Sequence, residues 1–351
     1  MSIHALKYAL PFVLSVGAYH SFSVTGWQVW LPLAWAWIAI PILELFIKPK
    51  EKNLSAAEEE MAKADRSYDI LLYLSVIFQY ILLIKFLYVM TNDTTMQWHD
   101  IVGRTWVMGM LCGVIGINVA HELGHRTNKS EQFLAKMLLL TSQYMHFYIE
   151  HNKGHHKKVS TPEDPSSARY NEWVYVFYFR TVFAGYISAW RIAFNDAKKK
   201  GKPVLSLHNE MIQFSIIQIA FVITIFFVFG WLTTLYYLIA AGIGILLLET
   251  VNYIEHYGLQ RKKTEDGKYE RAMPAHSWNS NHVIGRLFLF ELSRHSDHHY
   301  LASRKYQLLR HHEDSPQMPT GYPGMLILSL FPPAWFWVMN KKIKQLEPEL
   351  N

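Results

Sequence analysis

Cysteine is nearly absent from this chain of 351 residues, which narrows its possible metal and redox chemistry. The single Cys112 lies inside an apolar run. The chain alone therefore forms no disulfide framework, no cysteine-ligated zinc module and no iron–sulfur cluster. A P-loop and a strand followed by G-x-G-x-x-G are also missing, so no nucleotide site is visible. Any electrons that the chemistry consumes must come from a partner.

Lysine and arginine are absent from three connections between apolar runs, at 23–26, 91–100 and 230–231. Thirteen of the 34 basic residues lie between residues 124 and 210, and thirteen more follow Tyr257. Positively charged segments tend to stay on the cytoplasmic side of a membrane. The formal charge of +6 therefore indicates membrane topology, with both termini cytoplasmic, and gives no reason to expect a nucleic-acid partner.

Apolar runs of about 20 residues, the length that crosses a bilayer core, are frequent. We predict six spans, at 8–22, 27–47, 68–90, 101–119, 212–229 and 232–254. The expected fold is an all-α integral membrane protein whose six-helix transmembrane bundle carries a helical cap on the cytoplasmic face. One membrane-embedded catalytic domain is expected over residues 1–351, with cytoplasmic segments at 48–67, 120–211 and 255–351.

Three further segments are predicted to be helices outside the bundle. The apolar runs 173–192 and 322–339 are interrupted by Arg180 and by Pro332–Pro333, so we expect helices lying at the membrane surface. The charged connector 51–66 is expected to form a short solvated helix.

The distribution of histidine is not explained by membrane spans alone. Most of the 18 histidines lie between residues 121 and 312. The segments HELGH, HNKGHH, NYIEHYGL and HSDHH contain His121, His125, His151, His155, His156, His256, His295, His298 and His299. Histidines four apart on a helix share one face. The predicted topology brings all four segments to the cytoplasmic side of the membrane.

Imidazole suits zinc, copper, iron and nickel, so the ligand type does not choose the metal. Nine histidines are too many for one ion and sufficient for two. A pair of iron ions at the edge of a bilayer indicates oxygen activation on an apolar substrate that arrives through the lipid.

Other functions share parts of this pattern. HELGH also matches H-E-x-x-H, in which two histidines bind zinc and the glutamate is the base. A membrane zinc protease would therefore use Glu122, but it would leave HNKGHH and HSDHH unexplained. A metal transporter would place its ligands along a path across the membrane. A membrane lipid or fatty-acyl desaturase shares the general arrangement of histidine segments and would yield an alkene.

The motifs HELGHRTN, NYIEHYGL, HSWNS and RHSDHH, with residues 318–325, make the chain resemble the membrane alkane 1-monooxygenases, a family that includes the xylene monooxygenases. The resemblance implies a non-haem centre of two iron ions held by the nine histidines. It also implies O2 as co-substrate and terminal hydroxylation of hydrocarbons, such as an n-alkane to a primary alcohol. The implied electron donor is rubredoxin, reduced by an NAD(P)H-dependent rubredoxin reductase, and the implied location is the bacterial cytoplasmic membrane.

Further side chains are expected near the centre. Hydrogen-bond partners of the ligands are expected among Asp164, Glu249, Glu255, His276 and Asp297. Trp35 and Trp37 are candidates to line a substrate channel. Structural or surface roles are expected for His146, His282, His311 and His312. A basic surface for an acidic electron carrier or for lipid head groups is expected at Arg126, Lys153, Lys157, Lys158, Arg304 and Lys305. The sequence leaves open the preferred hydrocarbon, the oligomeric state and the distribution of ligands between the ions.

Overall fold

The computed structural model describes residues 3–350, and this part of the chain is helical, with two isolated β-bridges and no strand. Its elements, in chain order, are α1 (Ile3–Leu6), η1 (Lys7–Ala9), α2 (Phe12–Ser21), η2 (Gly26–Trp30), α3 (Leu31–Ala34), η3 (Trp35–Ala39), α4 (Ile40–Phe46), α5 (Ala56–Ala64), α6 (Ser67–Asn92), α7 (Trp98–Leu111), η4 (Cys112–Ile117), α8 (Asn118–Gly124), α9 (Lys129–Thr141), α10 (Phe147–Glu150), η5 (His151–His155), α11 (His156–Lys158), α12 (Val174–Lys199), α13 (Glu210–His256), η6 (Pro274–His276), α14 (Val283–Phe288), α15 (His295–Tyr300), η7 (Tyr306–Leu308), α16 (Tyr322–Ser329) and α17 (Pro332–Leu350). The predicted all-α class is confirmed.

Four helical segments are long and apolar enough to cross a membrane: Gly26–Phe46, Ser67–Asn92, Trp98–Gly124 and Glu210–His256. The predicted first span at 8–22 instead contains a 3-10 turn followed by the ten-residue helix α2, which is too short to join this group. The structure therefore confirms four segments of spanning length among the described residues, and it does not confirm the predicted count of six spans.

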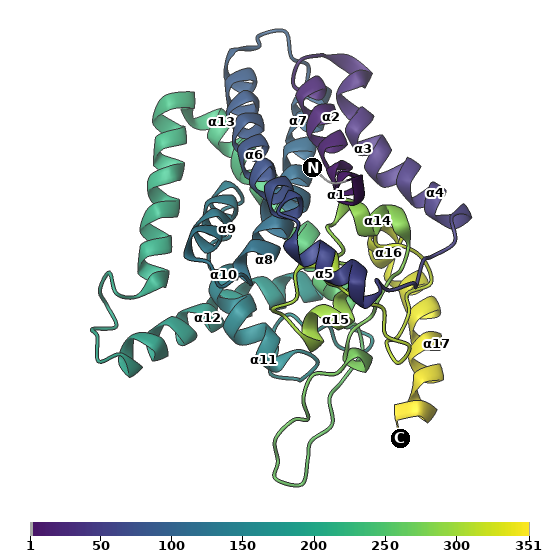
Figure 1. Ribbon diagram of the computed structural model, residues 1–351. Helices are drawn as coiled ribbons and strands as arrows, with labels where there is room; N and C mark the ends of the chain where they lie inside the picture. The colour runs from purple at the N-terminus through teal and green to yellow at the C-terminus, as the bar shows by residue number, and fades with distance from the viewer. Residues whose placement is uncertain (1–2, 351) are drawn as a thin grey trace. The chain divides into compact units, whose positions relative to one another are not determined.

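The longest segment, α13, has 47 residues and contains a break at Gly230, where φ is 82° and ψ is 167°. A positive φ is accessible to glycine because it has no Cβ. The break separates the two runs predicted as spans, 212–229 and 232–254, and Figure 1 shows the two arms of α13 meeting at a sharp bend. Phe227 and Trp231 beside the bend are 80% and 66% exposed, as expected where a helix faces lipid.

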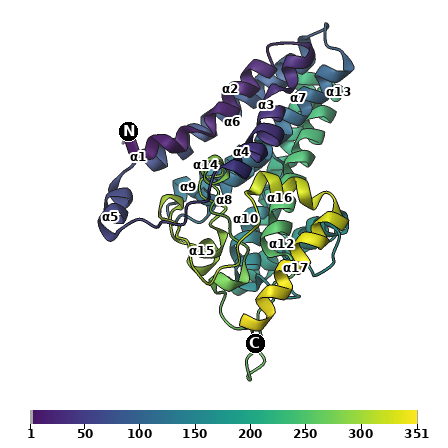
Figure 2. The same ribbon diagram turned by 90° about the vertical axis from the view of Figure 1, so that its right-hand side faces the viewer.

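The chain divides into two compact units. The first contains residues up to 38, 66–152 and 186–248. In it α6 packs against α2, α7 and α9, and both views show α2 running beside α6 (Figures 1 and 2). Helix α7 continues through η4, a π-helical segment, into α8. A π-helical turn takes one more residue than an α-helical turn, so η4 changes the direction in which α8 presents its side chains.

Glycines let α13 approach η4 closely within the first unit. A Cβ added at Gly244 would lie 2.5 Å from Cβ of Cys112, and one at Gly113 would lie 2.7 Å from Leu247. Close approach of backbones through small residues is a common way of packing helices in membranes, where no hydrophobic effect drives helices together. The segment before the HELGH motif is therefore held against α13 by contacts that leave no room for a larger residue.

We expect Gly244→Ala to destabilise the protein, because its methyl group would overlap Cys112, an overpacking cost of about 1–3 kcal/mol. Gly242→Ala is the matched control on the same helix, since nothing lies within 4 Å of a Cβ there. The control reports the gain in helix propensity, which favours alanine by roughly 1 kcal/mol. Thermal unfolding in detergent should show a lower Tm for Gly244→Ala than for Gly242→Ala; equal values would contradict the packing argument.

The second unit contains residues 39–65, 153–185 and 249 onward. Helices α14 and α16 both contact α4, and α16 packs on α17 (Figure 2). The connector helix predicted within 51–66 is confirmed as α5, which starts with a capping box formed by Ser55 and Glu58. The run predicted at 322–339 is two helices, α16 and α17, with the proline pair opening α17. Proline is well tolerated in the first turn of a helix.

Candidate metal centre

Four of the predicted histidines meet inside the second unit: His155, His256, His295 and His299. His155 ends η5 and His256 ends α13, while His295 and His299 lie one turn apart on α15. The spacing of four residues places the last two on the same helix face, as predicted for HSDHH. All four side chains are buried. One ligand atom from each residue lies within 4.8 Å of those of the other three.

The Nε2 atoms of these four rings converge. The distance is 2.9 Å between His295 and His299, 3.2 Å between His295 and His256, and 3.2 Å between His299 and His155. Two nitrogens bound to one ion at about 2.0–2.1 Å, at an angle near 90–110°, are about 3 Å apart. The observed separations therefore match the spacing of ligands on a common metal ion.

Hydrogen bonding alone does not account for this arrangement. A ring nitrogen carries either one proton or one lone pair in the ring plane, so it makes one strong hydrogen bond. Nε2 of His295 nevertheless faces two other Nε2 atoms, and so does Nε2 of His299. A cation at the point of convergence would use all four lone pairs at once. The four residues therefore fit a metal ion.

The protonation state of His299 also suits a metal ligand. Burial holds the pKa of His299 well below its usual value of 6.5, and the neighbouring histidines lower it further. A charged imidazolium is poorly solvated in such a place. The ring is therefore neutral at pH 7 and has a lone pair to offer.

Asp164 fixes the orientation of one of the four rings. Its Oδ2 lies 2.9 Å from Nδ1 of His155 and accepts a 2.6 Å hydrogen bond from Ser167 Oγ. Burial alone would raise the pKa of Asp164, but the contact with His155 and the hydrogen bond from Ser167 hold that pKa below its usual value of 3.8. An ionised acceptor at Nδ1 keeps the proton there and leaves Nε2 free, which is the arrangement typical of metal-binding histidines.

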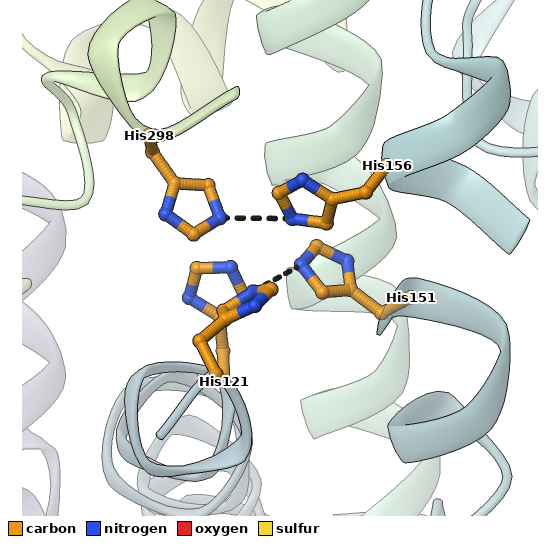
Figure 3. A group of neighbouring side chains, drawn as sticks. His121, His151, His156 and His298 are labelled. Atoms are coloured by element: carbon orange, nitrogen blue, oxygen red, sulfur yellow. Dashed lines mark hydrogen bonds between the residues drawn. The ribbon is translucent and has the colours of Figure 1, made fainter. Parts of the chain in front are cut away.

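Three more of the predicted histidines meet inside the first unit. His121 lies in α8, His125 follows it as the cap, and His151 begins η5. The ring centroids are 4.9 Å apart for His121 and His125 and 4.5 Å apart for His121 and His151, and Nε2 of His151 lies 3.1 Å from Nε2 of His125 (Figure 3). Phe147, one turn before His151, stacks on its ring at 4.7 Å. An apolar wall of this kind excludes water from the ligands.

The last two predicted histidines form a pair in the second unit. Nε2 of His156 lies 3.1 Å from Nε2 of His298, and Figure 3 shows the two rings facing each other. His298 leaves α15 between His295 and His299, so this short helix directs ligands in more than one direction. Each of the nine predicted histidines therefore has another histidine nitrogen about 3 Å away or a histidine ring in contact.

The glutamate of HELGH is engaged in an ion pair. Oε1 of Glu122 lies 2.6 Å from the guanidinium of Arg126, which also lies 3.3 Å from Asp69. A metalloprotease of the H-E-x-x-H type needs this glutamate as a base beside the metal-bound water. The pairing with Arg126 supports a structural role for Glu122.

The other residues expected near the centre have varied surroundings. Glu249 accepts hydrogen bonds from Thr181 and Asn252. Nε2 of His276 lies 3.2 Å from Oε1 of Glu270. The backbone carbonyl oxygen of His276 accepts a hydrogen bond from Ser160 Oγ. Asp297 is fully buried and is bound by Arg304 and His312. Asp297 therefore ties the segment after α15 back onto that helix.

Trp35 and Trp37 lie in the π-helical segment η3. Trp35 is 40% exposed and Trp37 is half-buried. Their role in a substrate channel remains a prediction.

The sequence did not predict a role for Ser167, which contacts Asp164, or for Tyr322, which contacts Glu255. Ser167 stands three residues after Asp164 in STPEDPSSAR, a spacing at which a hydroxyl can reach back to a carboxylate. Tyr322 donates a 2.8 Å hydrogen bond to Oε1 of Glu255. No local pattern links Tyr322 to Glu255, because the two are 67 residues apart.

Apolar helices of spanning length, together with converging buried histidines that could hold a metal ion, are typical of a membrane protein with a metal centre. The model of the fatty acid desaturase family matches residues 97–328. The chain is 40% identical over 322 residues to alkane 1-monooxygenase 2 of Pseudomonas aeruginosa, covering 89% of this chain and 85% of the relative. It is 37% identical over 338 residues to alkane 1-monooxygenase 2 of Alcanivorax borkumensis (95% and 87%) and 47% identical over 247 residues to alkane 1-monooxygenase 1 of P. aeruginosa (70% and 65%). The chain belongs to the alkane 1-monooxygenase family, and the predicted resemblance is confirmed.

Proposed function

We propose that this protein hydroxylates the terminal carbon of an n-alkane to give a primary alcohol. The reaction consumes the alkane, O2, two electrons and two protons, and it yields the alcohol and water. The observation that carries the proposal is the convergence of four buried imidazole nitrogens at ligand spacing, in a chain whose relatives are named alkane 1-monooxygenases.

The nine histidines are proposed to hold two non-haem iron ions. We propose that His155, His256, His295 and His299 hold one of the two ions. Bound iron supplies the activation of O2 and the removal of a hydrogen atom from the substrate. Support comes from the neutral state of His299 and from the ligand-to-ligand spacing of the rings.

The protein's own groups orient the ligands and keep water out. Asp164 holds the proton of His155 on Nδ1, and we propose that Glu249, His276 and Asp297 support the surrounding segments. Phe147 covers His151. Exclusion of water protects a reactive centre from side reactions.

We propose that the chain forms one membrane-embedded domain with six spans, in which the arms of α13 and the segment 8–22 complete the bundle. The proposed location is the bacterial cytoplasmic membrane, and the distribution of lysine and arginine supports an orientation with the histidines on the cytoplasmic side. Rubredoxin, reduced by its NAD(P)H-dependent reductase, is the proposed electron donor. The hydrocarbon substrate is proposed to arrive from the lipid.

Purified protein loaded with ferrous iron should convert octane to 1-octanol in the presence of O2, NADH, rubredoxin and rubredoxin reductase. Omission of rubredoxin is the control and should abolish the product. Octene would identify a desaturase instead. Tightly bound zinc with peptide cleavage would identify a protease. The absence of octanol from iron-loaded protein, under conditions where a relative produces it, would overturn the proposal.

A further inference from the structure

We propose that Glu255 is itself a ligand, binding through Oε2 the ion that the four histidines of the second unit hold, while Tyr322 holds the other carboxylate oxygen. The sequence predicts for Glu255 only a hydrogen bond to a ligand. The inference rests on the proposed metal centre and adds an oxygen donor to a set of nitrogen donors.

The position of Glu255 is unusual for a carboxylate that only orients a histidine. An orienting acceptor binds the ring nitrogen that points away from the metal, as Asp164 does at Nδ1 of His155. Oε2 of Glu255 instead lies 3.2 Å from Nε2 of His295. That nitrogen is the one that also faces Nε2 of His299 and of His256. The carboxylate is therefore on the inner side of the ring, with the other donors.

The distance of Oε2 from the ring nitrogen is compatible with two ligands that share one ion. An oxygen and a nitrogen bound to one ion at about 2.0–2.2 Å are about 3 Å apart, and the separation of Oε2 from Nε2 of His295 is of this size. Nε2 of His295 binding a metal has no proton left to donate to a carboxylate. With an ion in place, the attractive partner of Oε2 is the ion.

Tyr322 and the backbone hold the carboxylate in this orientation. The Tyr322 hydroxyl donates a 2.8 Å hydrogen bond to Oε1, and the carbonyl oxygen of Glu255 accepts one from the Trp278 amide. Glu255 is 1% exposed and Tyr322 is fully buried. One oxygen is thus occupied by the protein, and the other is directed at the histidines.

Charge balance supports the same conclusion. Four neutral imidazoles leave the charge of a buried cation uncompensated, which is costly in a medium of low polarity. Hard oxygen donors are also suited to iron, whose sites in oxygenases often combine histidine with a carboxylate. Asp164 is buried as well, but it is already bound to His155 and Ser167. Glu255 is the carboxylate directed at the metal-facing side of these rings.

The test uses Glu255→Gln, which keeps the size of the side chain and removes its charge. Full-length protein is loaded with isotopically enriched ferrous iron, and iron content and the Mössbauer spectrum are measured. We expect the signal of one of the two ions to shift or to be lost, while the signal of the other ion is unchanged. Glu163→Gln, at an exposed position, is the matched control and should leave both signals unaltered.

Tyr322→Phe is the second variant, in case Glu255→Gln does not fold. It keeps the carboxylate and removes the hydrogen bond to Oε1, so a smaller shift of the same signal is expected. Spectra identical to the wild type in both variants would overturn the ligand role, even if the wild type produces octanol. A wild-type protein that binds no iron would overturn the proposed function together with this inference.

Discussion

His299→Ala is expected to abolish formation of octanol and to remove about one iron ion per chain. Nε2 of His299 lies 2.9 Å from Nε2 of His295 and 3.2 Å from Nε2 of His155. The substitution therefore removes the ligand that lies between these two histidines. A methyl group cannot replace a metal ligand, and the cavity left behind admits water. Iron analysis of the purified variant and the octane assay measure the two effects.

The control for this experiment is His208→Ala, because His208 is exposed and its side chain contacts Ser206. Its iron content and turnover should equal those of the wild type. Retention of both ions by His299→Ala, with normal turnover, would remove His299 from the ligand set and would leave the four-histidine site without support.

The second large effect is expected for Asp164→Asn. Asparagine keeps the shape but has no charge, and its amide group can present a donor to Nδ1 of His155 where the ring needs an acceptor. Replacing such outer partners typically lowers metal affinity or activity by about 10–100-fold. Titration of the apoprotein with ferrous iron should show weaker binding of one ion, together with lower turnover.

Ser167→Ala distinguishes the effect of the Asp164 charge from the effect of the hydrogen bond that Asp164 accepts from Ser167. It removes the 2.6 Å hydrogen bond to Oδ2 of Asp164 and leaves the carboxylate in place, so a smaller loss of affinity is expected. If Asp164→Asn binds both ions as tightly as the wild type, the hydrogen bond to His155 does not orient a ligand.

Much of the fold follows from patterns that are local in the chain. The thickness of a bilayer determines how long an apolar run must be, and this rule found the four spanning segments. The break at 230–231 and a short helix within 51–66 were also predicted, because an interrupted apolar run and a charged connector are both local features of the chain. Run 8–22 was less well determined, since its helix is short and begins after Pro11.

The nine candidate ligands were visible because histidine spacing on a helix is local too. What no local pattern contains is the direction in which a side chain points once distant segments pack. The π-helical segment η4 rotates α8, and an ideal helical repeat for 101–119 does not include that rotation.

The sequence by itself determined the class of protein, the apolar segments and the histidines available to a metal, because bilayer thickness and helical repeat act within a few turns of chain. Only the tertiary structure decided that His155, His256, His295 and His299 form one group, that Asp164 faces Nδ1 of His155, and that Glu255 is held by Tyr322 against His295. These contacts join residues up to 144 positions apart, and their geometry depends on the packing of whole helices.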